Sequence, residues 1–313
     1  MSLRARIAYT LLTTYILTFY SEWVFWSGRP PAPDFFLEAI PTWLFYAVAT
    51  FLFLTAASYF RVQNIWAVFL VGAVYGWLVE GVLAQTLYND FPINISFTGL
   101  AWHALFSVVF GWWYLPRRLR MGRAIIPCLV FGLGLGLWSI GWWTEPDIVV
   151  AAPESVFLYN FTFGLLLIPA YVLWDRFDFT RFRPSRFEII GVLIVVVLYF
   201  FFVAVPTQPL ALIVLPPLLA LVLWTLRAWR NRQNTAEISI KTDTITFKKA
   251  LPLLLIPLTA SLIYTGVLEI GVSFPGLQVL YAITTPLGFL LLGISIYKTI
   301  RQGNDKIEII ASQ

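Results

Sequence analysis

The chain has 313 residues, of which 59% are hydrophobic and 12% are charged, whereas a soluble domain is about half apolar and about a quarter charged. The apolar residues stand in long blocks, which excludes a soluble globular domain and a disordered chain. The net charge of +5 does not indicate a nucleic-acid partner, because the basic residues lie between the apolar blocks. We therefore expect an all-α polytopic integral membrane protein, with the lipid bilayer as its surroundings.

Ten blocks are long enough to cross a bilayer, for which a helix needs roughly 20 mostly apolar residues. They are expected at 6–26, 38–60, 65–88, 95–115, 124–144, 155–174, 188–206, 209–228, 250–271 and 277–297. Only Pro206-Thr207-Gln208-Pro209 separates the seventh block from the eighth, which leaves open whether these two form a full spanning pair. The first block has no small-residue cleavage site, so we interpret it as a retained helix and not a signal peptide.

The basic residues predict the orientation of the bundle. If the N-terminus is cytoplasmic, every one of the 21 Lys and Arg residues except Arg29 falls on the cytoplasmic side, as the positive-inside rule requires. Both termini are therefore expected in the cytoplasm, and the plasma (inner) membrane of a prokaryote is the expected location. An acidic outer mouth would attract cations. Its acids are Glu22, Asp34, Glu38, Glu80, Asp90, Glu145, Asp147, Glu154 and Glu269.

Four regions follow along the chain. Residues 1–230 are expected to form a membrane bundle of helices one to eight, organised as helical hairpins. Residues 231–249 form a cytoplasmic loop, in which 237–241 and 244–248 alternate like two short strands and predict a small hairpin. Residues 250–298 supply helices nine and ten, and 299–313 form a cytoplasmic tail.

Glu80 and His103 are the strongest candidates for a catalytic or coupling pair, because an ionisable group inside the membrane is costly and usually functional. They stand at matching distances on either side of the turn at 89–92, so an antiparallel hairpin brings them to similar depth. Small residues in steps of four accompany both and predict closely packed faces: Gly72 and Gly76 before Glu80, and Gly99, Ser107 and Gly111 around His103. We therefore expect a Glu80–His103 hydrogen bond; the alternative is a purely structural buried pair.

Four further polar residues are predicted to line a substrate-binding cavity open to the outside. Glu22 follows three threonines in steps of four, Glu269 ends a similar polar stripe, and Glu145 and Asn160 lie on the fifth and sixth helices. For Glu22, Glu145 and Glu269 an interfacial position without a binding role is the alternative.

Three functions remain open at this stage. The first is a transporter for a cation or a proton-coupled solute, with Glu80 and His103 as the coupling pair. The second is a membrane enzyme that acts on a lipid or isoprenoid by acid–base chemistry at the same pair. The third is a non-catalytic subunit or assembly factor that packs against partner membrane subunits. No nucleotide or cofactor motif is present, so no cofactor is predicted, and a metal held by His103 and carboxylates is left undecided.

Overall fold

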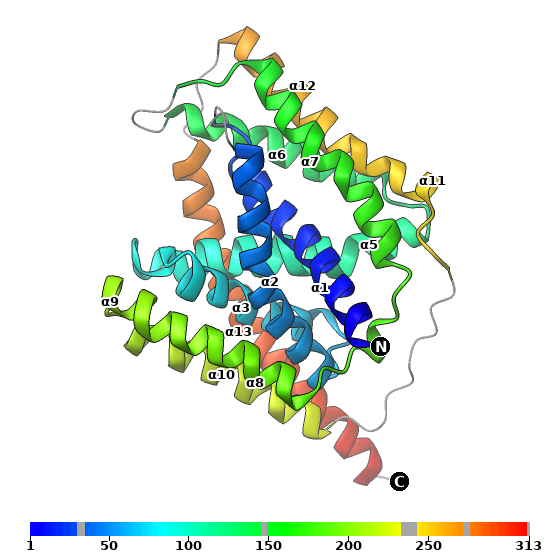
Figure 1. Ribbon diagram of the computed structural model, residues 1–313, viewed down its shortest axis with the longest axis vertical. Coiled ribbons are helices and arrows are strands. Elements are labelled where there is room, and N and C mark those ends of the chain that lie inside the picture. The colour runs from blue at the N-terminus through cyan, green and yellow to red at the C-terminus, as the bar shows by residue number, and fades with distance from the viewer. Residues whose placement is uncertain (30–34, 145–148, 233–242, 272–275, 312–313) are drawn as a thin grey trace.

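The computed structural model describes residues 1–29, 35–144, 149–232, 243–271 and 276–311, and each of the ten predicted blocks contains helix (Figure 1). No strand occurs in these ranges. Eight helices there are long and apolar enough to cross a membrane, so the chain is a helical, multi-pass membrane protein. These candidate spans are Leu37–Tyr59, Ile65–Leu83, Ile93–Arg120, Pro153–Trp174, Arg186–Thr207, Ala211–Asn231, Phe247–Ile270 and Gln278–Arg301.

The helices follow one another with few interruptions, and several continue from α-helix into π-helix. The elements are α1 (Leu3–Thr18) and the π-helix η1 (Phe19–Trp23); α2 (Phe35–Tyr59); α3 (Ile65–Leu78) and the π-helix η2 (Val79–Leu83); the short η3 (Thr86–Tyr88); α4 (Ile93–Ser96), the π-helix η4 (Phe97–Tyr114) and α5 (Leu115–Arg120); α6 (Ile125–Gly141) and η5 (Trp142–Thr144); α7 (Pro153–Trp174); η6 (Phe179–Arg181); α8 (Arg186–Tyr199), the π-helix η7 (Phe200–Ala204) and α9 (Val205–Thr207); α10 (Ala211–Arg232); α11 (Phe247–Ala250), η8 (Leu251–Leu254) and α12 (Leu255–Ile270); and α13 (Gly276–Ala311).

Two of the ten predicted blocks are helical without being among the candidate spans. The first, α1 with η1, carries buried threonines and the acid Glu22, which lower its hydropathy. The fifth, α6, is 17 residues long, about 25 Å of helix, which is short of the roughly 30 Å hydrocarbon core. The first block is therefore too polar, and the helix in the fifth block too short, to be counted among the candidate membrane spans.

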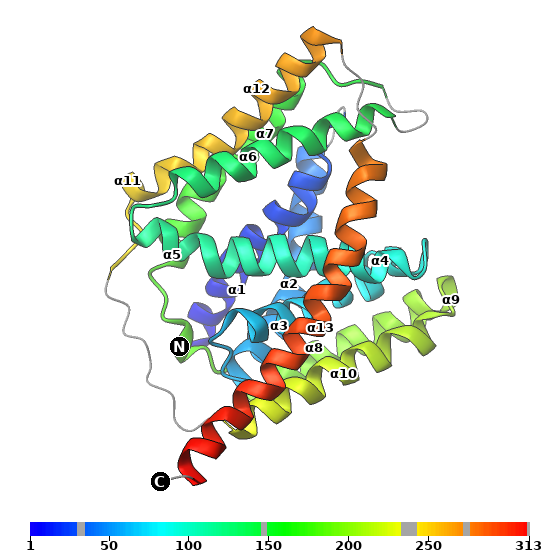
Figure 2. The same cartoon turned by 180° about the vertical axis from the view of Figure 1, so that it is seen from behind.

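The last two helices, α12 and α13, pack against different parts of the bundle. α12 lies against α6 and α7, whereas α13 packs against α3, η4 and α10. Figures 1 and 2 show α6, α7 and α12 together at one side of the molecule and α8 and α10 at the opposite side, with α1, α2, α3, η4 and α13 between them. α13 thus joins the central group, and its helix runs on through most of the predicted tail to Ala311.

Contacts between distant segments gather basic residues at one end of the bundle. The start of α8 is set by a capping box, in which Ser185 accepts from the backbone of Glu188 and the Glu188 side chain accepts from the backbone of Ser185. The same Glu188 carboxylate pairs with Arg6 near the start of α1, with 2.7 Å between Nη2 and Oε2. The N-terminal ends of α1 and α8 therefore lie together.

A second ion pair places the ends of α5 and α7 at the same end. Arg120 donates from Nε and Nη2 to Oδ1 of Asp175, at 2.9 and 2.7 Å. Trp174, at the end of α7, stacks on Tyr9 in the first turns of α1, with ring centroids 5.7 Å apart. We call this end, marked by Arg6 and Arg120, the basic end; it groups basic segments as the predicted orientation requires.

The predicted hairpin in the loop is only partly covered by the described residues. Its first strand, 237–241, lies outside them. Its second strand, 244–248, does not form, because Thr246 accepts from the backbone of Lys249 and caps a helix that begins at Phe247. The backbone N–H of Ile245 is instead paired with Asp175 Oδ2 at 2.7 Å, which fastens this segment to the end of α7.

Candidate functional site

The hairpin of α3 and η4 brings Glu80 and His103 together. Oε1 of Glu80, in η2, lies 2.7 Å from Nε2 of His103, in η4. Glu80 is 6% exposed and His103 is 1% exposed. The predicted hydrogen bond is thus confirmed. Both groups are buried, and an unpaired charge would be costly in such a position.

A strained turn after η2 brings the hydroxyl group of Thr86 next to the Glu80 carboxylate. Gln85 has a φ of 62°, a left-handed conformation that is uncommon for a residue with a side chain. This residue is the N-cap of η3, shortly after η2, and it lets Thr86 donate from its hydroxyl to Oε2 of Glu80. Both carboxylate oxygens of Glu80 therefore have partners, His103 on one and Thr86 on the other.

A second carboxylate stands close to this pair. Glu22, in η1, accepts from the Tyr46 hydroxyl at 2.6 Å and from Trp26 Nε1 at 3.1 Å. It is near enough to interact electrostatically with both His103 and Glu80. The segments η1, α2, α3, η2, η3 and η4 thus contribute to one largely buried polar cluster. We call it the acid–imidazole cluster: Glu22, Tyr46, Tyr75, Glu80, Thr86 and His103.

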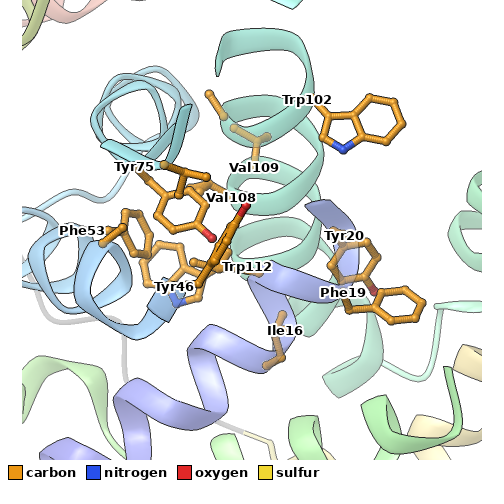
Figure 3. Close-up of a cluster of buried hydrophobic side chains, with 14 of the residues drawn as sticks. Ile16, Phe19, Tyr20, Tyr46, Phe53, Tyr75, Trp102, Val108, Val109 and Trp112 are labelled. Atoms are coloured by element: carbon orange, nitrogen blue, oxygen red, sulfur yellow. The ribbon is translucent and has the colours of Figure 1, made fainter. Parts of the chain in front are cut away.

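Tyr46 and Tyr75 contribute two phenol rings to the cluster, one bonded to Glu22 and the other against His103. The Tyr75 ring meets the His103 ring edge-on, with centroids 5.7 Å apart. Figure 3 shows Tyr75 beside Tyr46, with η4 behind them. The other ring nitrogen of His103, Nδ1, is buried and has no hydrogen-bond partner among the described residues, so it can still form a hydrogen bond with a bound group.

The packed face that carries the pair agrees only in part with the predicted stripes. Gly72 faces Ala104 and Val108 of η4, and Gly76 faces Gly99 and His103, as expected for a close contact between helices. Gly111 lies instead against Tyr20 of η1. Because η4 is a π-helix, its hydrogen bonds span five residues and a step of four does not follow one face. The small residues of η4 therefore contact α3 near His103 and η1 near Gly111.

The other predicted binding residues do not all join this cluster. Asn160 is buried on α7, and its amide nitrogen has no hydrogen-bond partner within the described ranges. Glu269 is exposed near the end of α12, in the helix group on the far side of the bundle (Figure 1). Glu145 lies outside the described residues. Among the residues that are described, no group of three His, Cys, Asp or Glu side chains converges as a metal site would require.

Two large cavities lie away from the cluster. One, of about 900 Å³, is lined by residues of α2, α3, α8 and α10. The other, of about 1090 Å³, is lined mainly by residues of η4, α6 and α13. Neither cavity is lined by Glu22, Glu80 or His103. A large substrate in either cavity would therefore not touch the acid–imidazole pair.

No known family model, curated protein or solved structure matches the chain. The sequence-based reasoning missed Tyr46 and Thr86 as members of the cluster. Tyr46 comes from a neighbouring helix with no spacing signal, and Thr86 is brought back to Glu80 only by the turn at Gln85. A residue six positions after Glu80 would not share its face in a continuous helix.

Proposed function

We propose that the chain is a carrier of the prokaryotic plasma membrane that couples a proton to the movement of a cation or small solute. The observation that carries this proposal is the buried 2.7 Å contact between Glu80 and His103, with the second acid Glu22 within electrostatic range. A carboxylate and an imidazole in contact can share a proton, and histidine is the side chain most often used to take up and pass on protons.

The secondary structure around the three groups supports a functional role. Glu22, Glu80 and His103 each lie in a π-helical segment, η1, η2 and η4. Segments of π-helix are rare in proteins and occur frequently at functional sites. A pair that served only for packing would not require π-helical winding in all three of the helices that supply these groups.

The size of the site favours a proton as the species bound at the pair. His103 is almost fully enclosed, while Thr86, bonded to the other oxygen of Glu80, is half-buried in the turn that follows η2. A half-buried hydroxyl bonded to the carboxylate is a position through which a proton could reach Glu80 from the turn. Glu22 is half-buried as well, and it supplies the negative charge that a cationic solute would approach.

A membrane enzyme is the second candidate. It is favoured by the 900 Å³ cavity, because Leu78 and Val82, which line it, stand two residues on either side of Glu80. Acid–base chemistry on a lipid needs the substrate within about 3 Å of the catalytic group. Glu80 points to the opposite side of α3, toward η4, so the carrier is the better-supported proposal.

The test is proton movement across proteoliposomes that contain the purified chain and a trapped pH-sensitive dye. Na⁺, K⁺, Mg²⁺ and mixtures of amino acids and sugars are added outside in turn, and the luminal pH is followed. We expect at least one addition to change the luminal pH, and Glu80→Gln to reduce that change to the level of empty vesicles. Glu154→Gln, at an exposed acid in the first turn of α7, serves as the matched control.

Equal behaviour of Glu80→Gln and Glu154→Gln would contradict the carrier proposal. The enzyme would then be tested by incubating the reconstituted protein with membrane lipids and comparing the lipid masses before and after. A Glu80-dependent change in lipid mass without proton movement would establish the second candidate.

A further inference from the structure

The 900 Å³ cavity has strongly apolar walls along most of its length. α2 contributes Leu52 and Ala56, α3 contributes Val74, and α8 and α10 close the other side with residues such as Val196 and Leu219. The faces of α8 around it are largely exposed, including Leu193 at 42%. A cavity that opens sideways between apolar helices is reached from the hydrocarbon of a bilayer, not from water.

Three arginines line this cavity at a single end. Ser58, near the end of α2, donates to the carbonyl of Phe182 at 2.6 Å, and this brings the end of α2 beside Arg183. The Arg230 guanidinium of α10 lies over the Tyr59 ring at 3.8 Å. Arg61, Arg183 and Arg230 are therefore grouped at the basic end, and no Asp or Glu occurs among the residues that line the cavity.

Arg61 occupies a backbone conformation that favours glycine. α2 ends in a Schellman motif, in which Val62 N–H donates to Ala57 O at 3.0 Å and Arg61 N–H donates to Ser58 O at 3.2 Å. The left-handed position of this motif usually holds glycine, yet Arg61 occupies it with φ of 50°. A side chain kept at a position where glycine would be more stable indicates a role for that side chain.

We propose that this cavity binds a membrane lipid with an anionic phosphate headgroup, whose acyl chain lies between α3, α8 and α10 and whose phosphate meets Arg61, Arg183 and Arg230. Guanidinium groups bind phosphate oxygens through paired N–H donors. Basic pockets between membrane helices are a known form of anionic headgroup recognition. The apolar length of the cavity selects a lipid over a soluble phosphate. This inference does not depend on the proposed carrier function.

The test uses the full-length chain in a non-ionic detergent, stripped of lipid, and measures binding of phosphatidylglycerol and phosphatidylcholine by native mass spectrometry and thermal stability. We expect the wild type to bind phosphatidylglycerol more tightly. Arg183→Gln and Arg230→Gln should each weaken that binding about fivefold, the effect of one basic residue near a lipid surface. Arg4→Gln, an exposed arginine near the start of α1 that does not line the cavity, is the control.

Two further variants separate lipid binding from folding. Arg61→Gly should raise the stability of the lipid-free protein, because it removes the strain, while it lowers phosphatidylglycerol affinity about fivefold. Leu193→Trp should weaken binding of long-chain phosphatidylglycerol more than that of a short-chain form, because it shortens the space for the acyl chain. Equal affinity of all variants for phosphatidylglycerol would overturn the proposal. Stabilisation by inorganic phosphate equal to that by the lipid would overturn it too, since a soluble anion site would be indicated.

Discussion

Gly76 of α3 packs directly on the backbone of Gly99 of η4, one helical turn away from the contact between Glu80 and His103. A Cβ atom at Gly76 would overlap the Gly99 carbonyl oxygen and would lie 2.9 Å from the Cβ of His103. The two helices therefore approach as closely as their backbones allow. This close approach places the carboxylate and the imidazole within hydrogen-bond distance.

We expect Gly76→Ala to destabilise the protein by about 1–3 kcal/mol, the usual result of overpacking a well-filled contact. The added methyl group would push α3 away from η4, so the Glu80–His103 contact would lengthen with it. The measurement is thermal or denaturant unfolding in detergent. Gly191→Ala in α8 is the matched control, since a Cβ there meets nothing within 4 Å, and it should leave stability unchanged or raise it by up to about 1 kcal/mol. Equal destabilisation by both variants would contradict the close contact.

Glu80 and His103 should be energetically coupled. Because each removes the cost of burying the other, Glu80→Gln combined with His103→Gln should lose less stability than the sum of the two single losses. The expected coupling free energy is about 0.5–3 kcal/mol, as found for residues in contact. Glu80→Gln combined with Gly191→Ala should be additive to within about 0.5 kcal/mol. Additive losses in the first pair would show that the two side chains do not meet in the membrane-embedded protein.

Asp175 should stabilise the basic end far more than its neighbour Asp178. Asp175 is 3% exposed and accepts from Arg120 and from the backbone of Ile245. Asp178 pairs with Arg181 at 3.3 Å on the surface. We expect Asp175→Asn to cost about 2–3 kcal/mol, because the partly buried Arg120 and the buried N–H of Ile245 lose their charged acceptor, and Asp178→Asn to cost less than about 1 kcal/mol. Unfolding in detergent measures both, and similar losses would count against a buried ion pair.

Single cysteines should report the orientation of the bundle. Cys128 is fully buried, so Cys128→Ala provides a background for labelling. In this background Asn89→Cys, at the exposed turn after η3, should react with a membrane-impermeant maleimide added to whole cells. Met121→Cys, 61% exposed at the end of α5, should react only after the membrane is opened. Labelling of Met121→Cys in intact cells would reverse the predicted orientation.

Hydropathy and spacing were sufficient to predict the helices and one essential contact. Long apolar blocks form helices because backbone polar groups must be satisfied within the segment when no water is present, so every predicted block contains helix. The Glu80–His103 bond was predictable because both residues lie on one hairpin, at equal distance from its turn and on faces marked by glycine. Local periodicity and chain direction carry this information without reference to any other part of the molecule.

The tertiary structure alone decided what surrounds that pair. The step-of-four pattern around His103 assumes an α-helix, and the π-helical winding of η4 turned Gly111 toward Tyr20 instead. Nor does the sequence indicate that the last two helices have different neighbours, with α12 packed on α6 and α7 while α13 joins the central group. Tyr46 reaches Glu22, and three arginines line one cavity, through packing between helices far apart in the chain. Apolar helices have many equally hydrophobic faces, so the choice of neighbours depends on side-chain fit and not on hydropathy.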